Sequence, residues 1–471
     1  MMELHHLTAT AAKDLFVTRE LSPVELLDAV VARTEKVGGA VNALTEQMLD
    51  EAYDAAREAE IRYAGSGPAP RALEGIPLLL KEEQAIAGRT LENGSFLMKG
   101  QVSPYTHPVV ERVQAAGAVV HGRTTTPEFS IMTVTHSEMW GVTRSPFNLD
   151  ATSGGSSGGA GAALGAGLTT LATGSDIGGS IRIPAAQCGV VGFKPPAGRV
   201  PGLPPFNYDA YCSDGPLGRS VADVALLQDV LAGPHFMDPA SLRPAYRLPD
   251  QLGDVSGMKV ALCLNLGDYP VDDVIAANTR AAADALRAVG VTVDEVELPW
   301  SRAQVLEVAW AHMSLAMGSF VNTLPPEALA VLNPYTREFI ENAKVPRDYT
   351  TGLYGEVEFY LPLSAILQEY DALLAPTVGA AMIAADTPSI DTPIPVNGED
   401  FGMYDVMLTM PFNINGRCPV LNVPSGIGPA GVPSGVQIVG RTFDDATVFH
   451  LGAALEKSLG VTTADDWWPT L

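Results

Sequence analysis

Apolar residues recur at helical spacing in some parts of the chain and form short unbroken runs in others. Residues 22–25 (SPVE) have the pattern of a helix start, with a capping serine, a proline in the first turn and a glutamate three positions after the serine. The apolar positions of 26–31 continue at helical spacing, and residues 51–63 predict a second helix. Residues 75–81 (GIPLLLK) are instead an unbroken apolar run, which predicts a short buried strand ending in Lys81.

Helical and strand-like segments continue to alternate towards the C-terminal end. A helix followed by a strand is expected within residues 107–129, and a strand, a helix and a second strand within 256–298. Further helices are expected at 160–171 and 220–231, and further strands at 190–194, 371–377 and 435–439. This alternation predicts an α/β fold with a mixed central β-sheet covered by helices on both faces. No repeat or long polar linker divides the chain, so we interpret residues 1–471 as a single domain.

Composition narrows the classes of function. The chain has 471 residues, of which 46% are hydrophobic and 18% are charged, so it can bury a large core and is not a disordered chain. The net charge of −25 argues against nucleic-acid binding, which needs a basic surface. No signal peptide and no apolar run of about 18 residues is visible, so a cytoplasmic protein without a membrane segment is expected. The four cysteines are widely spaced, which indicates reduced thiols rather than a zinc site or a disulfide framework: Cys188, Cys212, Cys263 and Cys418.

The Gly/Ser/Ala-rich segment at 153–184 is the most unusual part of the chain. A flexible linker would be polar throughout, whereas this segment contains many apolar residues and runs into an expected strand. Residues 154–158 fit the G-x-S-x-G turn of some serine hydrolases, but a turn-like stretch precedes them instead of a strand. The histidines that follow are His235, His312 and His450, none of them in a distinctive setting. A phosphate-binding loop is also poorly supported, because no Gly-Lys-Ser/Thr completes it.

The segment closely resembles the signature of the amidase signature family, G-G-S-S-G-G followed by G-T/S-D-x-G-G-S-I-R-x-P. Residues 75–81 resemble the family's G-I-P-x-x-x-K strand, and residues 122–129 its G-K-T-x-x-x-E-F segment. Further matches follow in order at 214–217, 376–377 and 435–439. The resemblance covers nearly the whole chain and implies one amidase domain. Its signature core would lie at about 70–200, and a more variable substrate-side region at about 300–410.

The resemblance to this family, and to its bacterial-type amidases, implies a serine hydrolase that works without histidine. Ser180 would be the nucleophile, Ser156 a bridging serine held by a cis peptide bond, and Lys81 the base. A serine hydroxyl is a poor nucleophile until a neighbouring group accepts its proton. A free lysine is protonated at neutral pH, so Lys81 has to be kept neutral by burial. The expected reaction is amide hydrolysis through an acyl-enzyme, with no metal and no organic cofactor.

Groups around the nucleophile complete the expected site. The resemblance implies an oxyanion hole formed by the backbone N–H groups of Ile177, Gly178, Gly179 and Ser180. Asp176 and Arg182 are expected to form a buried ion pair that fixes the loop. Ser157 is expected to hydrogen-bond near Lys81 and orient it.

Three positions depart from the family's usual residues. Ser175 stands where the family more often has threonine, a change that preserves the hydroxyl. The family's K-D-N sequence at the base is here Lys81-Glu82-Glu83. A carboxylate that faced the lysine would favour its charged form and hinder it as a base. We therefore expect the side chains of Glu82 and Glu83 to point away from Lys81.

A substrate pocket is expected on the apolar side of the nucleophile. Ile131, Met132 and Thr133 correspond to the strip that lines the acyl side in the family. Tyr208 and Phe412 are further candidates, because they are aromatic residues in loop-like, proline-rich surroundings. The same pattern is shared by Tyr211, Phe401, Tyr404 and Met410, of which only some are expected to cover the site. These residues predict a small, neutral, hydrophobic or aromatic substrate with an amide, ester or carbamate (urethane) bond, and the expected assembly is a homodimer.

Three other functions remain open at this point. Within the family, the chain could be the A subunit of a tRNA-dependent amidotransferase, which acts as a glutaminase in a complex, although the negative charge and the sequence after 340 argue against it. A non-catalytic binding protein is disfavoured because Lys81, Ser156 and Ser180 are all present. A conventional Ser–His hydrolase would depend on a late histidine such as His450.

Overall fold

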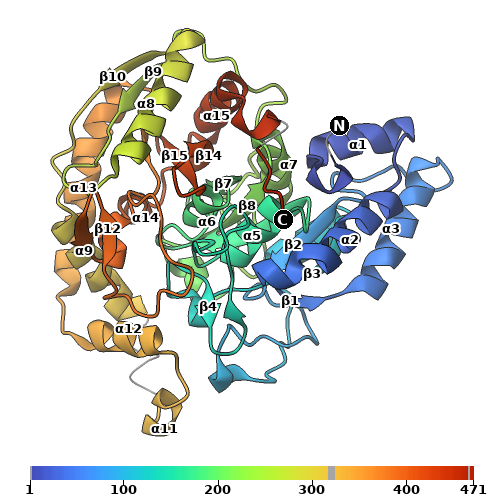
Figure 1. Ribbon diagram of the computed structural model, residues 1–471, viewed down its shortest axis with the longest axis horizontal. Coiled ribbons are helices and arrows are strands. Elements are labelled where there is room, and N and C mark those ends of the chain that lie inside the picture. Colours follow the sequence, from blue (N-terminus) through green and yellow to red (C-terminus); the bar gives the residue numbers. More distant parts are fainter. Residues whose placement is uncertain (1–2, 317–323, 465–466) are drawn as a thin grey trace.

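A mixed β-sheet runs through the molecule and separates two layers of helices (Figure 1). The computed structural model describes residues 3–316, 324–464 and 467–471, and in these ranges eleven strands form the sheet in the order β1-β3-β2-β6-β8-β7-β14-β15-β11-β9-β10. The strands are β1 (Leu44–Gln47), β2 (Pro77–Lys81), β3 (Val119–Thr124), β6 (Leu171–Asp176), β7 (Val191–Lys194), β8 (Ser213–Gly218), β9 (Lys259–Leu262), β10 (Thr292–Glu295), β11 (Ala372–Pro376), β14 (Val420–Ile427) and β15 (Pro433–Gly440). The sheet contains parallel pairs such as β2–β6 and antiparallel pairs such as β6–β8, so the predicted mixed α/β sheet is confirmed.

Helices cover both faces of this sheet. Their bounds are α1 (Ala9–Thr18), α2 (Pro23–Val41), α3 (Leu49–Tyr63), α4 (Pro108–Ala115), α5 (Gly158–Ala166), α6 (Arg182–Gln187), α7 (Val221–Leu231), α8 (Asp273–Ala288), α9 (Arg302–Ala316), α11 (Pro326–Leu329), α12 (Pro334–Lys344), α13 (Tyr349–Glu369), α14 (Pro411–Ile414) and α15 (Asp445–Leu459). Two small antiparallel pairs lie outside the main sheet: β4 (His136–Ser137) with β5 (Gly141–Val142), and β12 (Ile394–Val396) with β13 (Glu399–Phe401).

Successive residues of one strand belong to different cores, as the two-residue period of a strand requires. On β11, Leu374 packs in a core with α7, α8 and α15, whereas Leu373 packs in a core with α9 and α13. Figure 1 shows the same division, with α8 and α15 on one side of the sheet and α9 and α13 on the other.

The same alternation decides where Lys81 points. Leu78 and Leu80 of β2 pack in a core with α1, α4 and α7, whereas Leu79 packs against Ala162 and its neighbours on α5. Lys81 lies two residues after Leu79, so its side chain leaves the strand on the α5 side. Because α5 begins at residue 158, the serines just before it lie at the end of the lysine side chain.

Most elements predicted from the sequence are present. The helix start at 22–25 is confirmed by reciprocal bonds, since the Glu25 N–H donates to Ser22 Oγ (3.1 Å) and the Ser22 N–H donates to the Glu25 carboxylate (2.8 Å). The helix expected at 160–171 is wrong in its second half. It ends at Ala166, and residues 171–176 form the buried strand β6, because this stretch pairs with β2 and β8 in the middle of the sheet.

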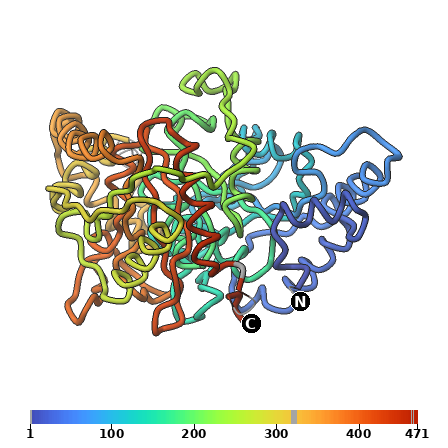
Figure 2. Tube along the Cα trace, turned by 90° about the horizontal axis from the view of Figure 1, so that it is seen from above, coloured from blue at the N-terminus to red at the C-terminus, as the bar shows by residue number. Residues whose placement is uncertain are grey.

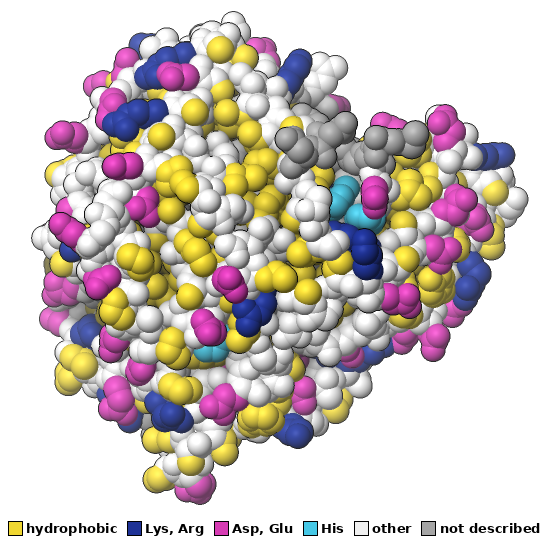
Figure 3. Space-filling model, in the orientation of Figure 1, with side chains coloured by type: hydrophobic (Ala, Val, Ile, Leu, Met, Phe, Trp, Pro, Cys, Tyr) yellow, Lys and Arg dark blue, Asp and Glu magenta, His cyan; other side chains and the backbone are white. Residues whose placement is uncertain are grey.

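The N-terminal helices and the C-terminal residues lie side by side (Figure 2). The ring of His6 stacks on Trp468 at 5.2 Å, and Arg33 donates to the backbone oxygen of Leu471. Acidic and basic side chains are scattered over the face shown in Figure 3, with no continuous basic patch on that face. Among the described residues, no helix is both long and apolar enough to cross a membrane.

Candidate active site

Lys81 lies at the end of β2 with its ammonium group surrounded by three oxygen partners. The side chain is fully buried. Its Nζ lies 2.7 Å from Ser156 Oγ, 2.9 Å from Ser175 Oγ and 3.2 Å from Glu83 Oε1. These three partners match the number of N–H groups on an ammonium. A neutral amine would donate to two of them and accept from the third.

Ser156 precedes α5 and follows a cis peptide bond between Gly155 and Ser156. Ser157 lies beside it and exchanges hydrogen bonds with the backbone of Ser175, with its Oγ 3.3 Å from both the Ser175 oxygen and the Ser175 nitrogen. Ser157 thus hydrogen-bonds near Lys81, to the residue whose hydroxyl contacts Nζ, and its expected role in orienting the lysine stays a prediction.

Ser180 lies in the loop between β6 and α6 and lines a cavity. The residue is 8% exposed. The Ser157 N–H donates to the Ser180 carbonyl oxygen (3.1 Å), which ties the two serine-containing segments together. In the part of the chain that the structure describes, no hydrogen bond joins the hydroxyls of Ser156 and Ser180.

Residues of the backbone segment before Ser180 line the cavity. Within the described residues, the N–H groups of Ile177, Gly178 and Ser180 have no protein acceptor. Gly179 differs, because its N–H donates to Asp176 Oδ1 (2.8 Å). Of the four N–H groups expected to form an oxyanion hole, that of Gly179 is therefore not free, because the Asp176 carboxylate accepts from it. Gly179 has φ +121°, and a Cβ there would lie 2.2 Å from the Thr409 hydroxyl, so only glycine fits.

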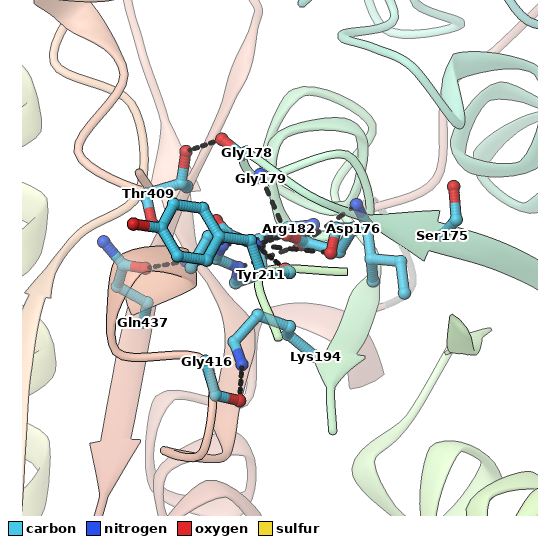
Figure 4. A network of polar contacts seen from close by, with 12 residues as sticks. Ser175, Asp176, Gly178, Gly179, Arg182, Lys194, Tyr211, Thr409, Gly416 and Gln437 are labelled. Atoms are coloured by element: carbon cyan, nitrogen blue, oxygen red, sulfur yellow. Dashed lines mark hydrogen bonds and ion pairs between the residues drawn. The ribbon is translucent and has the colours of Figure 1, made fainter. Parts of the chain in front are cut away.

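The predicted buried ion pair between Asp176 and Arg182 is present and is part of a larger network (Figure 4). Arg182 Nη2 and Nε lie 2.9 and 3.0 Å from the two carboxylate oxygens of Asp176. Arg182 also donates to Gln437 and Asn413, and Asn413 donates to Asp176 Oδ1 (2.8 Å). Burial opposes ionisation of Asp176, but the Arg182 charge and these hydrogen bonds lower the pKa of its carboxyl to about 2. The loop is thus held by a buried ion pair whose two charged groups both have further hydrogen-bond partners.

Several members of this network come from parts of the chain that the sequence did not single out. The Thr409 hydroxyl donates to the Gly178 carbonyl oxygen (2.6 Å), and Gln437 donates to two backbone oxygens near it. Lys194 is buried nearby and donates to the carbonyl oxygens of Cys418 (2.9 Å) and Gly416 (3.2 Å). Burial lowers the pKa of Lys194 to about 8. No local motif marks these residues, because their partners lie far away along the chain.

The two glutamates after Lys81 have different surroundings. Glu82 points away as expected, and its carboxylate accepts from the backbone N–H groups of Glu92 (2.7 Å) and Asn93 (3.0 Å). Burial raises the pKa of Glu82 to about 7. The expectation for Glu83 is wrong, because its carboxylate contacts Lys81 directly and also accepts from the Ser130 hydroxyl. Burial alone would raise the pKa of Glu83, but the charge of Lys81 and the hydrogen bonds to the carboxylate hold that pKa below its ordinary value.

The strip after Glu128, residues 129–133, has an unusual backbone, and the Glu128 side chain ties its start to neighbouring segments. Phe129 and Ser130 both have positive φ, at 52° and 58°, which is rare for residues other than glycine. The buried Glu128 carboxylate accepts from Ser95 Oγ (2.6 Å) and from the N–H of Asn333 (2.7 Å) at the start of α12. Glu128 thus joins the strip to a helix that covers the site.

The cavity in front of Ser180 has a volume of about 470 Å³, a size typical of small-molecule sites. Its apolar lining comes from several elements distant in sequence: Ile131, Met132, Ile177, Leu306, Trp310, Met313, Phe339, Tyr404, Met407 and Met410. Its polar lining lies around Ser180 and towards β8, and includes Glu83, Ser175, Thr133, His107 and Asp214. Within the described residues no lysine or arginine lines it.

Comparison with known proteins agrees with this geometry. The family model described as Amidase matches residues 25–449. The chain belongs to the amidase family. A curated member, the acylamidase of Rhodococcus erythropolis, is 31% identical over 466 residues, which cover 96% of this chain and 95% of that protein. The A subunit of the glutamyl-tRNA(Gln) amidotransferase of Synechococcus sp. (strain CC9605) is 32% identical over 491 residues, which cover 98% of each chain.

Solved structures of the amidase family have the same architecture. A bacterial aryl acylamidase, described as an amidase signature enzyme, superposes with a TM-score of 0.91 over 100% of both chains at 27% identity. The 6-aminohexanoate cyclic dimer hydrolase complexed with its substrate superposes with a TM-score of 0.80 over 98% of both chains at 28% identity. The predicted family membership is therefore confirmed, and this protein acts on amide bonds as a member of the family.

Within this amidase fold, the prediction of the pocket is wrong for two of its five residues, Tyr208 and Phe412. Ile131, Met132 and Thr133 line the cavity as expected. Tyr208 is 68% exposed and does not line it, because its short helical turn carries the ring outwards. Phe412 is fully buried in the core between the sheet and α13. Of the four other aromatic or apolar candidates, Tyr404 and Met410 line the cavity.

The late histidines that a conventional Ser–His amidase would require lie elsewhere. His235 contacts Glu111, and His312 contacts Asp209, while His450 lies on α15. Among the described residues, only His107 brings a histidine ring to the cavity, and its Nε2 lies 3.6 Å from Asp214. In the same ranges, no group of three or more potential ligands could hold a metal ion.

Proposed function

We propose that the protein hydrolyses carboxylic amides through an acyl-enzyme, with Ser180 as nucleophile, Ser156 as proton relay and Lys81 as base. The observation that carries this proposal is the contact of 2.7 Å between Lys81 Nζ and Ser156 Oγ in a fully buried setting. A neutral lysine there would donate to Ser175 and Glu83 and accept from the Ser156 hydroxyl. This leaves the lone pair of Nζ directed at the proton that it has to take.

The proposed reaction moves one proton along this chain of groups. Ser180 Oγ attacks the carbonyl carbon while its proton passes to Ser156 Oγ, and the proton of Ser156 passes to Lys81 Nζ. For this transfer the Ser180 hydroxyl turns towards Ser156, as is common for hydrogen bonds that tighten only in the substrate complex. The π electrons of the carbonyl move to its oxygen, which gains a negative charge. The amide groups of Ile177, Gly178 and Ser180 are the proposed donors to that oxyanion.

The second half of the reaction returns the proton. When the tetrahedral intermediate collapses, the C–N bond breaks and the leaving amine takes the proton back from Lys81 through Ser156. Water then attacks the acyl-enzyme with the same assistance, and the carboxylic acid is released. The network around Asp176 and Arg182 supports these steps by keeping the loop that carries Ser180 fixed.

The cavity supports a neutral substrate with an apolar or aromatic group. Its walls bring together Ile131, Trp310 and Phe339, which offer large apolar surfaces. Among the described residues no lysine or arginine faces the cavity, although a carboxylate-bearing substrate would need a cationic partner. We therefore propose aryl amides as the main class, with activated aryl esters and carbamates as further substrates because they react at the same kind of carbonyl. The similarity to a bacterial aryl acylamidase supports the same choice.

Glutaminase activity within a tRNA-dependent amidotransferase is the second candidate, favoured by the identity to A subunits of that enzyme. Glutamine carries both a carboxylate and an ammonium group. The lack of a basic residue in the described cavity lining argues against tight binding of this carboxylate. Ammonia release from glutamine that exceeds p-nitroaniline release from aryl amides would favour the second candidate.

A chromogenic panel of p-nitroanilides, nitrophenyl esters and nitrophenyl carbamates tests the proposal, with Ser180→Ala as the blank. A fluorophosphonate probe should label the wild-type protein and not Ser180→Ala. Ser213→Ala is the matched control, because Ser213 also lines the cavity and its hydroxyl has no partner among the described residues. Undiminished turnover by Ser180→Ala would overturn the proposed nucleophile.

A further inference from the structure

Lys81 has an acidic neighbour in a position where the family pattern has asparagine. Glu83 Oε1 lies 3.2 Å from Lys81 Nζ, and the other side of the carboxylate accepts from the Ser130 hydroxyl. The Glu83 side chain is 21% exposed and faces the cavity, whereas Lys81 is fully buried. At this distance the carboxylate interacts strongly with the charge on the lysine, so it influences whether Lys81 is protonated.

A base that alternates between neutral and charged forms is sensitive to such a neighbour in two ways. In the resting enzyme a carboxylate favours the charged form of the lysine. A smaller share of the lysine is therefore neutral, and able to act as a base, at a given pH. Once Lys81 has taken the proton of Ser156, the same carboxylate stabilises the new ammonium. The first effect moves the working range to higher pH, and the second lowers the barrier of the chemical step.

We propose that Glu83 is a positioning residue and charge partner for Lys81, which holds Nζ against Ser156 and stabilises the ammonium that forms when Ser180 attacks. This inference rests on the proposed function. Glu83 takes the place of the third group that orients a catalytic base in other hydrolases. Its contact with Ser130 also joins the base to the strip that lines the cavity.

Other titratable groups near this pair are few among the described residues. Asp214 on β8 pairs with Gln84 (2.8 Å) and lies 3.6 Å from His107 at the start of α4, and Cys212 precedes it. Glu82 faces Arg123 and the backbone on the other side of the chain, at 3.7 Å from that guanidinium. Glu83 alone among these groups contacts the lysine Nζ.

The pH dependence of kcat/KM for an aryl amide tests the role of Glu83. Glu83→Gln keeps the size of the side chain and removes its charge. We expect the rising limb of the profile to move to lower pH by about one unit, and the plateau to fall by about tenfold. A role in packing alone would lower the plateau and leave the limb in place.

Two control variants keep the test specific. Glu82→Gln removes the adjacent carboxylate, which does not contact Lys81, and should leave the midpoint of the limb unchanged. Ser130→Ala removes the hydroxyl that binds Glu83 but keeps the charge, so the midpoint should stay while KM rises about threefold. Thermal unfolding of each variant checks that the fold is retained.

A limb that stays in place in Glu83→Gln, or that moves in Glu82→Gln instead, would overturn the inference. These results differ from a failure of the proposed function. If Ser180→Ala kept its activity or the probe did not label Ser180, the base and nucleophile would be wrong, whatever Glu83 did.

Discussion

The two walls of the cavity are built by different kinds of contact. The wall that carries Ser180 includes backbone and polar side chains such as those of Glu83 and Ser175. Behind this wall, polar groups of β2, β6 and α6 are joined by hydrogen bonds such as those between Asp176 and Arg182. A second wall, from α9 and α12, consists mainly of apolar side chains such as Trp310 and Phe339, whose rings lie 5.0 Å apart.

This difference has a physical consequence. Hydrogen bonds and ion pairs in a buried network depend on direction, and removing one partner leaves another unsatisfied. Apolar contacts depend mainly on area and volume, so they tolerate changes of residue. We therefore expect the first wall to determine whether the protein reacts at all, and the second to determine which substrate it takes.

The largest effect is expected from Lys81→Ala, which removes the proposed base from the polar wall. The fall in kcat/KM should reach about a thousandfold or more, because groups that act together in a hydrolase lose most of their effect when one is removed. Lys99→Ala, at an exposed lysine outside the cavity lining, is the control and should match the wild type. A change of less than tenfold in Lys81→Ala would contradict the comparison.

Arg182→Met should affect stability before it affects specificity. The variant leaves the Asp176 carboxylate buried without its cation, at a cost of about 3–5 kcal/mol in the free energy of unfolding. Urea unfolding followed by fluorescence measures this loss. Removal of the exposed pair between Arg57 and Asp54 is the control and should change the same free energy by less than about 1 kcal/mol. Equal losses in both variants would show that the buried network has no special role.

Trp310→Ala tests the apolar wall. Removing the indole should lower kcat/KM for a bulky aryl amide by about tenfold through KM, because much contact area is lost. A small aliphatic amide, which does not reach α9, should be hydrolysed at an unchanged rate. Substrate panels of increasing size measure the difference. A uniform loss for all substrates would place Trp310 with the polar wall.

The smallest effect concerns a carboxyl group that lies in neither wall and whose pKa is raised mainly by burial. Burial raises the pKa of Glu456 on α15 to about 8 from its ordinary 4.5, although the Val221 N–H donates to it. Because the folded protein then holds this proton more tightly than the unfolded chain, stability is full below about pH 4.5 and declines as the pH rises through about 8.

Glu456→Gln cannot ionise and keeps an acceptor for Val221. The variant should therefore lose less stability between pH 5 and pH 9, with a melting temperature about 2–4 °C above that of the wild type at the alkaline end. Thermal unfolding at both pH values measures this. An identical decline in the two proteins would contradict the assignment to Glu456.

Sequence reasoning succeeded where the signal was local or long. The helix at Pro23–Val41 has its cap and its apolar spacing within a few residues, and the strand at Pro77–Lys81 is an unbroken apolar run. It failed at β6, because the composition of residues 160–171 suits a helix throughout while the pairing partners that make 171–176 a strand lie far away in sequence.

The candidate site divides in the same way. The family signature singled out Lys81, Ser156 and Ser180, whose roles remain proposals, and the ion pair of Asp176 with Arg182 was predicted from a spacing of six residues. The pocket was harder. Tyr208 and Phe412 share an aromatic character with residues that do line the cavity, and nothing in the local pattern tells which side of the backbone faces it.

The sequence by itself therefore determined the family, the α/β fold and the residues of the proposed reaction, because a long contiguous signature and the apolar periodicity of its flanks lie in neighbouring positions. Only the tertiary structure decided that Glu83 contacts Lys81 while Glu82 does not, that the Gly179 N–H donates to Asp176, and that α9 and α12 form the apolar wall. These features depend on where a strand end directs its side chains and on contacts between segments far apart in the chain, which no local pattern contains.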